Sequence, residues 1–135
     1  MATTLETLRY AVRTPHNVED AVRAVQQALA RRGFGVLWTL DVNRQLEEKG
    51  LALRDQVRIL EVCSAPRALQ ALETNPAVAL LLPCKVVVSS RDGETEIALP
   101  RPTALLALVG DPRLEPLAAE VDALLRAAVE EAAGA

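Results

Sequence analysis

The sequence predicts an α+β fold: a two-layer sandwich with a mainly antiparallel sheet of about five strands and helices packed on one face. Short segments with strand-like alternation are interleaved with segments whose apolar residues recur at helical spacing. Two central strands are joined by Arg91-Asp92-Gly93-Glu94, and Asp-Gly accepts the positive φ angles of a tight hairpin turn. A hairpin inside the sheet excludes an all-parallel arrangement.

The composition is that of an ordinary globular chain. The 135 residues favour a single domain over residues 1–135, which can fold without a disulfide or a metal. The net charge is only −3 and no basic run exceeds two residues, so we expect no nucleic-acid partner. No apolar run approaches the length that crosses a membrane, and the chain begins without a secretory signal. We therefore expect no membrane partner and a cytoplasmic location.

The first strand and helix are predicted from a change of period. Residues 8–12 alternate between apolar and polar side chains, as in a half-buried strand. Asn17 is a favourable N-cap for a helix over residues 18–32. Gly33 suits the left-handed position that ends such a helix.

A second strand is predicted over residues 34–40, followed by a short helix. Strict alternation places one set of side chains on a single face of this strand: Phe34, Val36, Trp38 and Leu40. Asp41 can then cap a helix over residues 42–49, which Gly50 ends.

Residues 57–62 predict a third strand, and a helix follows it directly. Ser64 or Ala65 opens this helix, and Pro66 is tolerated in its first turn. Asn75-Pro76 stops it, because the residue before proline avoids the helical conformation.

The longest apolar stretch, residues 77–90, is interpreted largely as a strand. Pro83 lies inside it and cannot donate to a sheet ladder, so we expect either an edge position or a bulge there. Residues 95–99 return as the partner strand. Residues 103–109 are too apolar for a loop and too short to assign, and residues 112–133 predict a final helix.

Two cysteines form the candidate site. Cys63 ends a strand just before a helix N-terminus, where the thiol pKa can be lowered, and Cys84 follows Pro83. The elements between them can bring the chain back near its start, so we expect the two thiols to lie close together. Three interpretations stay open: packing of small apolar side chains, a redox or ligand-binding thiol pair, and a metal site completed by a dimer.

Two charged residues complete the candidate set. Lys85 is adjacent to Cys84 and can favour its thiolate, or it is only a solvated charge. Asp41 is either a functional carboxylate near the cysteines or simply the helix cap. The only histidine, His16, lies in a turn, so no catalytic triad is predicted, and no metal or other cofactor is expected.

Four stretches resemble a known family. They are DVNRQLEEKGL (41–51), RILEVCSAPRALQAL (58–72), LLPCKVVV (81–88) and DGETEIALPRP (92–102). Together they are similar to the family called domain of unknown function 302. Many relatives carry Cys-Asn-Pro where this chain has Ser64-Ala65-Pro66, so a role for an asparagine side chain does not carry over. The resemblance implies an α+β sandwich and a homodimer, and it implies no established activity.

Two functions are compatible with this sequence. The leading hypothesis is a non-enzymatic module that binds a small ligand or another protein and acts as a homodimer. It follows from the few catalytic residue types and from a central strand that is apolar on both faces. The alternative is a thiol-dependent redox, small-ligand-binding or metal-binding activity of Cys63 and Cys84.

Overall fold

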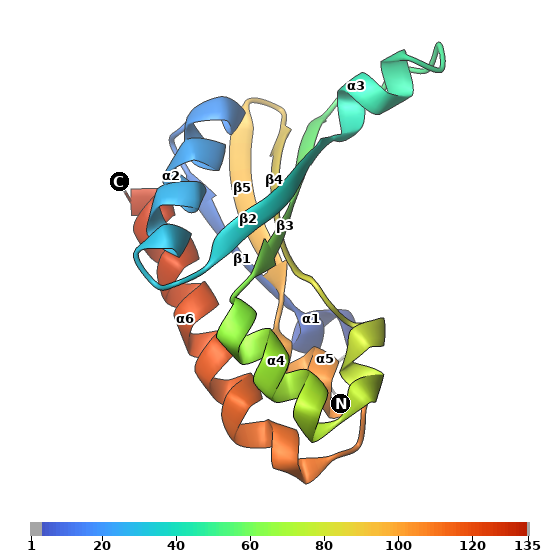
Figure 1. Cartoon of the computed structure of the whole chain (residues 1–135). Helices are drawn as coiled ribbons and strands as arrows, with labels where there is room; N and C mark the ends of the chain where they lie inside the picture. Colours follow the sequence, from blue (N-terminus) through green and yellow to red (C-terminus); the bar gives the residue numbers. More distant parts are fainter. Residues whose placement is uncertain (1–3, 135) are drawn as a thin grey trace.

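The computed structural model describes residues 4–134 as one sheet backed by helices (Figure 1). The elements in chain order are α1 (Thr4–Leu8), β1 (Arg9–Thr14), α2 (Val18–Ala30), β2 (Gly35–Asp41), α3 (Val42–Glu47), β3 (Gln56–Cys63), α4 (Ala65–Thr74), the 3₁₀ helix η1 (Pro76–Leu80), β4 (Cys84–Arg91), β5 (Glu94–Pro100), α5 (Pro102–Ala107), the 3₁₀ helix η2 (Pro112–Leu114) and α6 (Glu115–Gly134).

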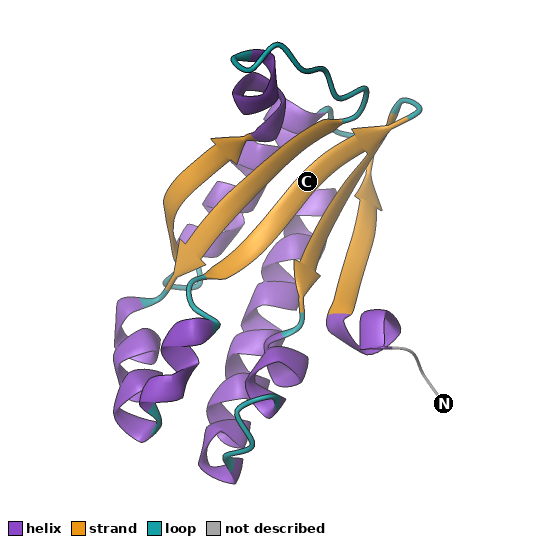
Figure 2. Cartoon of the chain, turned by 90° about the vertical axis from the view of Figure 1, so that its right-hand side faces the viewer, coloured by secondary structure: helices purple, strands orange, loops and turns teal. Residues whose placement is uncertain are grey.

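The five strands form one open sheet in the order β1-β5-β4-β3-β2, and every neighbouring pair is antiparallel. The long helices α2 and α6 pack against each other and against one face of this sheet. In Figure 2 the strands lie in front of these two helices, and no helix crosses in front of the strands. The predicted α+β architecture is confirmed.

The core lies between the sheet and its helices. Side chains from the inner face of the central strands are fully buried: Leu60, Val62, Val86, Val88 and Ile97. They pack with buried side chains of α2 and α6, including Val25, Leu29, Leu125 and Val129. Burying this apolar surface is the main stabilising contribution to the fold.

The predicted helix cap at Asn17 and the predicted hairpin turn at Asp92-Gly93 are both confirmed. Asn17 accepts a hydrogen bond from the backbone N–H of Asp20 at 2.8 Å and caps α2. Between β4 and β5, Asp92 and Gly93 have φ angles of 53° and 82°, as a turn with two left-handed residues requires.

The predicted face of β2 is wrong because the strand contains a bulge. Val36 pairs with Val62, but Trp38 pairs with Glu61, so Leu37 is an extra residue in the ladder. An extra residue reverses the alternation of the side chains that follow it. Val36 therefore shares the core face with Val62, whereas Trp38 turns to the opposite face and is 57% exposed.

Pro83 lies neither at an edge strand nor in a bulge. It precedes β4, which begins at Cys84 and occupies the centre of the sheet. The ladder therefore never requires its missing N–H. Residues 76–80 form the helix η1 and not the start of a strand, because Pro76 follows the capping side chain of Asn75.

Two other segments differ from the sequence expectation. Leu8 ends the short helix α1 and does not open β1. The unassigned residues 103–109 fall mostly within α5, which packs against α6 and begins at Pro102 in its first turn. This placement of α5 closes the end of the core nearest to the cysteines.

Candidate functional site

The two cysteines lie at the same end of the sheet on neighbouring strands. Cys63 is the last residue of β3, and Cys84 is the first residue of β4, opposite Val62. Both are free thiols and half-buried, so they form no disulfide with each other. Both line a single pocket.

This pocket is formed where the sheet end meets α4, α5 and α6. It has a volume of about 50 Å³. Its lining comes from distant parts of the chain: Phe34, Val62, Cys63, Ser64, Arg67, Ala68, Ala71, Leu81, Leu82, Cys84, Pro102, Leu105, Leu106, Leu117 and Val121. Apart from Ser64 and Arg67, these side chains offer only carbon and sulfur atoms. A space of this size with such walls favours an apolar occupant over ordered water.

The thiol of Cys84 is held in its neutral form. Burial raises the pKa of Cys84 to about 11, and the neighbouring Cys63 and Glu61 act in the same direction. The positive charge of Lys85 acts in the opposite direction and is outweighed. The expected activation of this thiol by Lys85 therefore does not prevail, because the loss of solvation is the larger effect.

The polar part of the pocket wall is provided by the first turn of α4. Ser64 precedes α4 and is buried, and its hydroxyl accepts a hydrogen bond from Nη1 of Arg67 at 3.2 Å. Nε of Arg67 donates to Glu120 of α6 at 3.3 Å. The same guanidinium lies 5.5 Å from the ring centre of Phe34. Arg67 thus joins α4 to α6, and its charge is already matched by a carboxylate.

Lys85 lies on the other side of the sheet from the core. It pairs in register with Glu61, and its ammonium group is 3.2 Å from Oε1 of that residue. The second carboxylate oxygen of Glu61 is buried and has no partner among the described residues. This pair faces away from the helices because its neighbours along the strands, Val62 and Val86, face the core.

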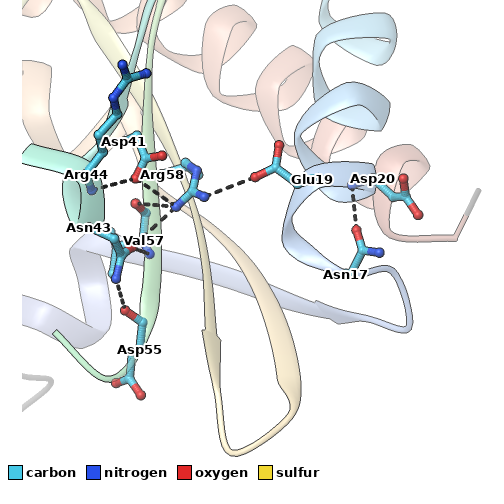
Figure 3. A network of polar contacts seen from close by, with 9 residues as sticks. All are labelled: Asn17, Glu19, Asp20, Asp41, Asn43, Arg44, Asp55, Val57 and Arg58. Carbon is cyan, nitrogen blue, oxygen red and sulfur yellow. Dashed lines mark hydrogen bonds and ion pairs between the residues drawn. The ribbon is translucent and has the colours of Figure 1, made fainter. Parts of the chain in front are cut away.

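Asp41 lies far from the cysteines. It accepts a hydrogen bond from the N–H of Arg44 at 3.0 Å and caps α3, and it also lies 3.2 Å from the guanidinium of Arg58. Figure 3 shows this network, in which Arg58 also reaches Glu19 of α2 at 3.0 Å. Asp41 pairs with Arg58 in the ladder, and Arg58 and Cys63 are five residues apart on β3, or about 16 Å.

Sequence reasoning pointed to the cysteines but missed Phe34 and Arg67. Arg67 stands three residues after Ser64 at the start of a predicted helix, and side chains at that spacing share one face. That spacing was the signal from which Arg67 could have been predicted. The pocket residues of α5 and α6 could not be predicted from any local pattern, because they reach the pocket only through the packing of distant segments.

The described residues offer neither a metal cluster nor a membrane-spanning helix. Within residues 4–134, no group of three or more histidine, cysteine, aspartate or glutamate side chains is arranged to hold a metal ion. Among the helices in that range, none has the length and apolar character needed to cross a membrane.

The comparisons with known proteins agree with this fold. The family model described as "Domain of unknown function DUF302" matches residues 10–132. The chain belongs to this family. A crystal structure of an uncharacterized conserved DUF302 protein from Bacillus stearothermophilus is 35% identical, with a TM-score of 0.89. That match covers 93% of this chain and 98% of the other. No curated protein matches the sequence. The description of the DUF302 family names no activity, so function has to be argued from the site.

Proposed function

We propose that this DUF302 protein is a non-enzymatic binding module that holds a small, uncharged apolar molecule in the pocket beside Cys84. The observation that carries the proposal is the pocket itself, which has apolar walls and a thiol that burial keeps neutral. Small-molecule sites are concave, mostly apolar and equipped with few polar groups, and this pocket of about 50 Å³ has that character for an occupant of only a few heavy atoms. A cytoplasmic location is part of the proposal, since unpaired thiols are the usual state of cysteine there.

The charges around the pocket select against an anionic ligand. Arg67 is the only cationic side chain in the pocket lining, and it already contacts Glu120 and the hydroxyl of Ser64. A ligand carboxylate would have to compete with Glu120 and would itself be desolvated. An uncharged ligand avoids both costs and needs only a space that its carbon atoms can fill.

A titration followed by methyl NMR tests this proposal. The pocket of about 50 Å³ admits only a few heavy atoms, so ethanol serves as the uncharged probe and acetate as its anionic counterpart. We expect ethanol to shift the methyl signals of Val62, Leu82 and Leu106 saturably, and acetate to leave them unchanged. Ala68→Leu, which fills the pocket, should abolish the shifts, and Ala119→Leu on the exposed side of α6 should retain them. Shifts that survive in Ala68→Leu, or none in the wild-type protein, would refute the proposal.

The thiol-dependent alternative makes a different prediction. A nucleophilic or redox thiol reacts as the thiolate, so it needs a pKa near or below neutral pH. The raised pKa of Cys84 disfavours this role. Rapid modification of Cys63 or Cys84 by a disulfide reagent in the native protein at neutral pH would favour the alternative, whereas reaction of both thiols only after denaturation supports the binding module.

A further inference from the structure

We propose that a groove between α5, η2 and α6 binds an amphipathic amine, meaning a molecule with an apolar chain and a protonated amino group. The groove, called the outer groove below, has a volume of about 470 Å³. Leu106 is the one described residue that it shares with the pocket beside Cys84. The inference goes beyond the proposed function and does not depend on what that pocket holds.

A turn after α5 forms the outer groove. Gly110 has a φ of 76°, the left-handed conformation that commonly ends a helix, and its N–H donates to the carbonyl of Ala107 at 3.1 Å. Asp111 accepts a hydrogen bond from the N–H of Arg113 at 3.0 Å and caps η2. The turn leads the chain into α6, which packs against α5 at the end of the molecule away from α3 (Figure 1). The groove lies where these elements meet.

The size of the outer groove matches a small organic molecule. Small-molecule sites commonly have volumes of about 300 to 1,000 Å³, and the outer groove has about 470 Å³. Nine described residues line it, whereas a standard protein interface involves about 20 to 30 residues on each side. The groove can therefore hold a chain of several carbon atoms that is too large for the pocket of about 50 Å³ beside Cys84.

Most of the groove wall is apolar. Five of its side chains consist of carbon and hydrogen alone: Leu106, Ala107, Pro112, Leu114 and Ala118. Leu114 and Ala118 are buried, and Ala107 and Pro112 are exposed. An alkyl chain that lies along these side chains leaves water, and each methylene group that it buries should strengthen binding by up to about fourfold.

Two polar side chains of the wall already have partners. Asp111 accepts hydrogen bonds from Nη2 of Arg113 at 2.6 Å and from Nδ2 of Asn75 at 3.1 Å. The hydroxyl of Thr103 donates to Asp122 at 2.8 Å. A ligand would have to displace these partners to use either group, so neither is its anchor.

Glu115 is the charge in the wall that has no partner. It is the first residue of α6 and is exposed, and its carboxylate forms no ion pair or hydrogen bond with another side chain of residues 4–134. The described wall contains no lysine, arginine or histidine. The groove therefore attracts a cation and repels an anion. An amino group beside Glu115, with its chain over the neighbouring Leu114, satisfies both the charged and the apolar part of the groove.

A methyl NMR titration with three probes of equal chain length tests the assignment. The probes are n-hexylammonium, n-hexanol and n-hexanoate. We expect hexylammonium to shift the methyl signals of Leu114 saturably and to leave those of Val62, which lines only the pocket beside Cys84, unchanged. Hexanoate should bind about tenfold more weakly than hexylammonium, and hexanol should lie between the two.

Two exposed carboxylates provide a matched pair of variants that should both fold. Glu115→Gln should weaken the binding of hexylammonium about threefold and leave that of hexanol unchanged. Glu47→Gln removes the same charge at an exposed position of α3, outside the groove, and should leave the binding of both probes unchanged.

Three results would overturn the proposal. The first is that hexylammonium leaves the Leu114 signals unchanged. The second is that it shifts those of Val62 in their place, which would put the amine in the pocket. The third is equal affinity for hexylammonium and hexanoate, or for hexylammonium in Glu115→Gln and the wild-type protein. Binding of ethanol beside Cys84 is measured separately, so failure of this proposal and failure of the proposed function are distinguishable.

Discussion

At the scale of single residues, the protonation state of Cys84 is set by its buried surroundings and not by the intrinsic acidity of a free thiol. Lys85 follows it in sequence, yet that side chain pairs with Glu61 on the opposite side of the sheet. What remains around the thiol is an apolar pocket, and burial raises its pKa to about 11. A cysteine at an exposed helix N-terminus would instead have a lowered thiol pKa.

The raised pKa of Cys84 predicts a loss of stability at alkaline pH. The unfolded thiol ionises near its ordinary pKa of 9.0, whereas the folded one stays protonated until about pH 11. Stability is therefore full below pH 9 and falls as pH rises toward 11, by up to about 3 kcal/mol. Urea unfolding of the wild-type protein and Cys84→Ala across this range measures the difference. If both proteins lose the same free energy, the thiol is not buried as described.

Asp122 predicts a second residue-scale effect. It is buried on α6, and it accepts hydrogen bonds from Arg126 at 2.7 Å and from the hydroxyl of Thr103 at 2.8 Å. Burial alone would raise the pKa of Asp122, but these bonds and those from Arg101 hold it below its usual range. Asp122→Asn should therefore cost about 2 to 4 kcal/mol at neutral pH, because it leaves two arginines without their carboxylate.

The control for Asp122→Asn is Asp20→Asn, which breaks an exposed pair with Arg23 on α2 and should cost under about 0.5 kcal/mol.

The lowered pKa of Asp122 also determines how its contribution to the free energy of unfolding depends on pH. Its contribution is present above the ordinary carboxyl pKa of 3.8 and is lost as pH falls through the lower folded value. Equal unfolding free energies for wild type and Asp122→Asn at neutral pH would contradict this account.

At the scale of elements, one asparagine fixes the segment that joins α3 to β3. α3 and the segment after it project beyond the end of the sheet (Figure 1). The amide of Asn43 donates to the carbonyl of Asp55 at 2.7 Å, and its oxygen accepts from the N–H of Val57 at 2.8 Å. The side chain thus bridges the start of α3 to the start of β3, which holds the projecting segment in place.

Asn43→Ala should release that segment without unfolding the protein. We expect hydrogen exchange at the N–H of Val57 to accelerate at least about tenfold, since it loses its acceptor. The exposed Gln45 on the same helix provides a matched control, and Gln45→Ala should leave the rate unchanged. Equal exchange at Val57 in Asn43→Ala and the wild-type protein would show that the bond does not fix the segment.

The elements also show how far the sequence can be interpreted. The hairpin at Asp92-Gly93 and the cap at Asn17 were predictable because they depend only on neighbouring residues. The bulge at Leu37 was not, because an extra residue is defined by the strand opposite. Pro83 was misplaced for a similar reason, since its effect depends on where β4 begins to pair. The cysteines were found from sequence, but their pocket depends on long-range packing by α5 and α6.

At the scale of the whole molecule, the long helices pack on only one face of the sheet. The helices α2 and α6 cover one face of the sheet, and the pocket lies at the end of the layer that they form with it. No helix of the described residues lies across the other face of the sheet in Figure 2.

Xenon binding in crystals tests the central claim most directly, because xenon enters any accessible apolar cavity of the whole molecule. We predict a xenon atom in the pocket beside Cys84, between Val62 and Leu82. It should be absent from Ala68→Leu and present in Ala119→Leu. Crystals of the wild-type protein that bind xenon elsewhere, with none beside Cys84, would contradict the assignment of this pocket as the binding site.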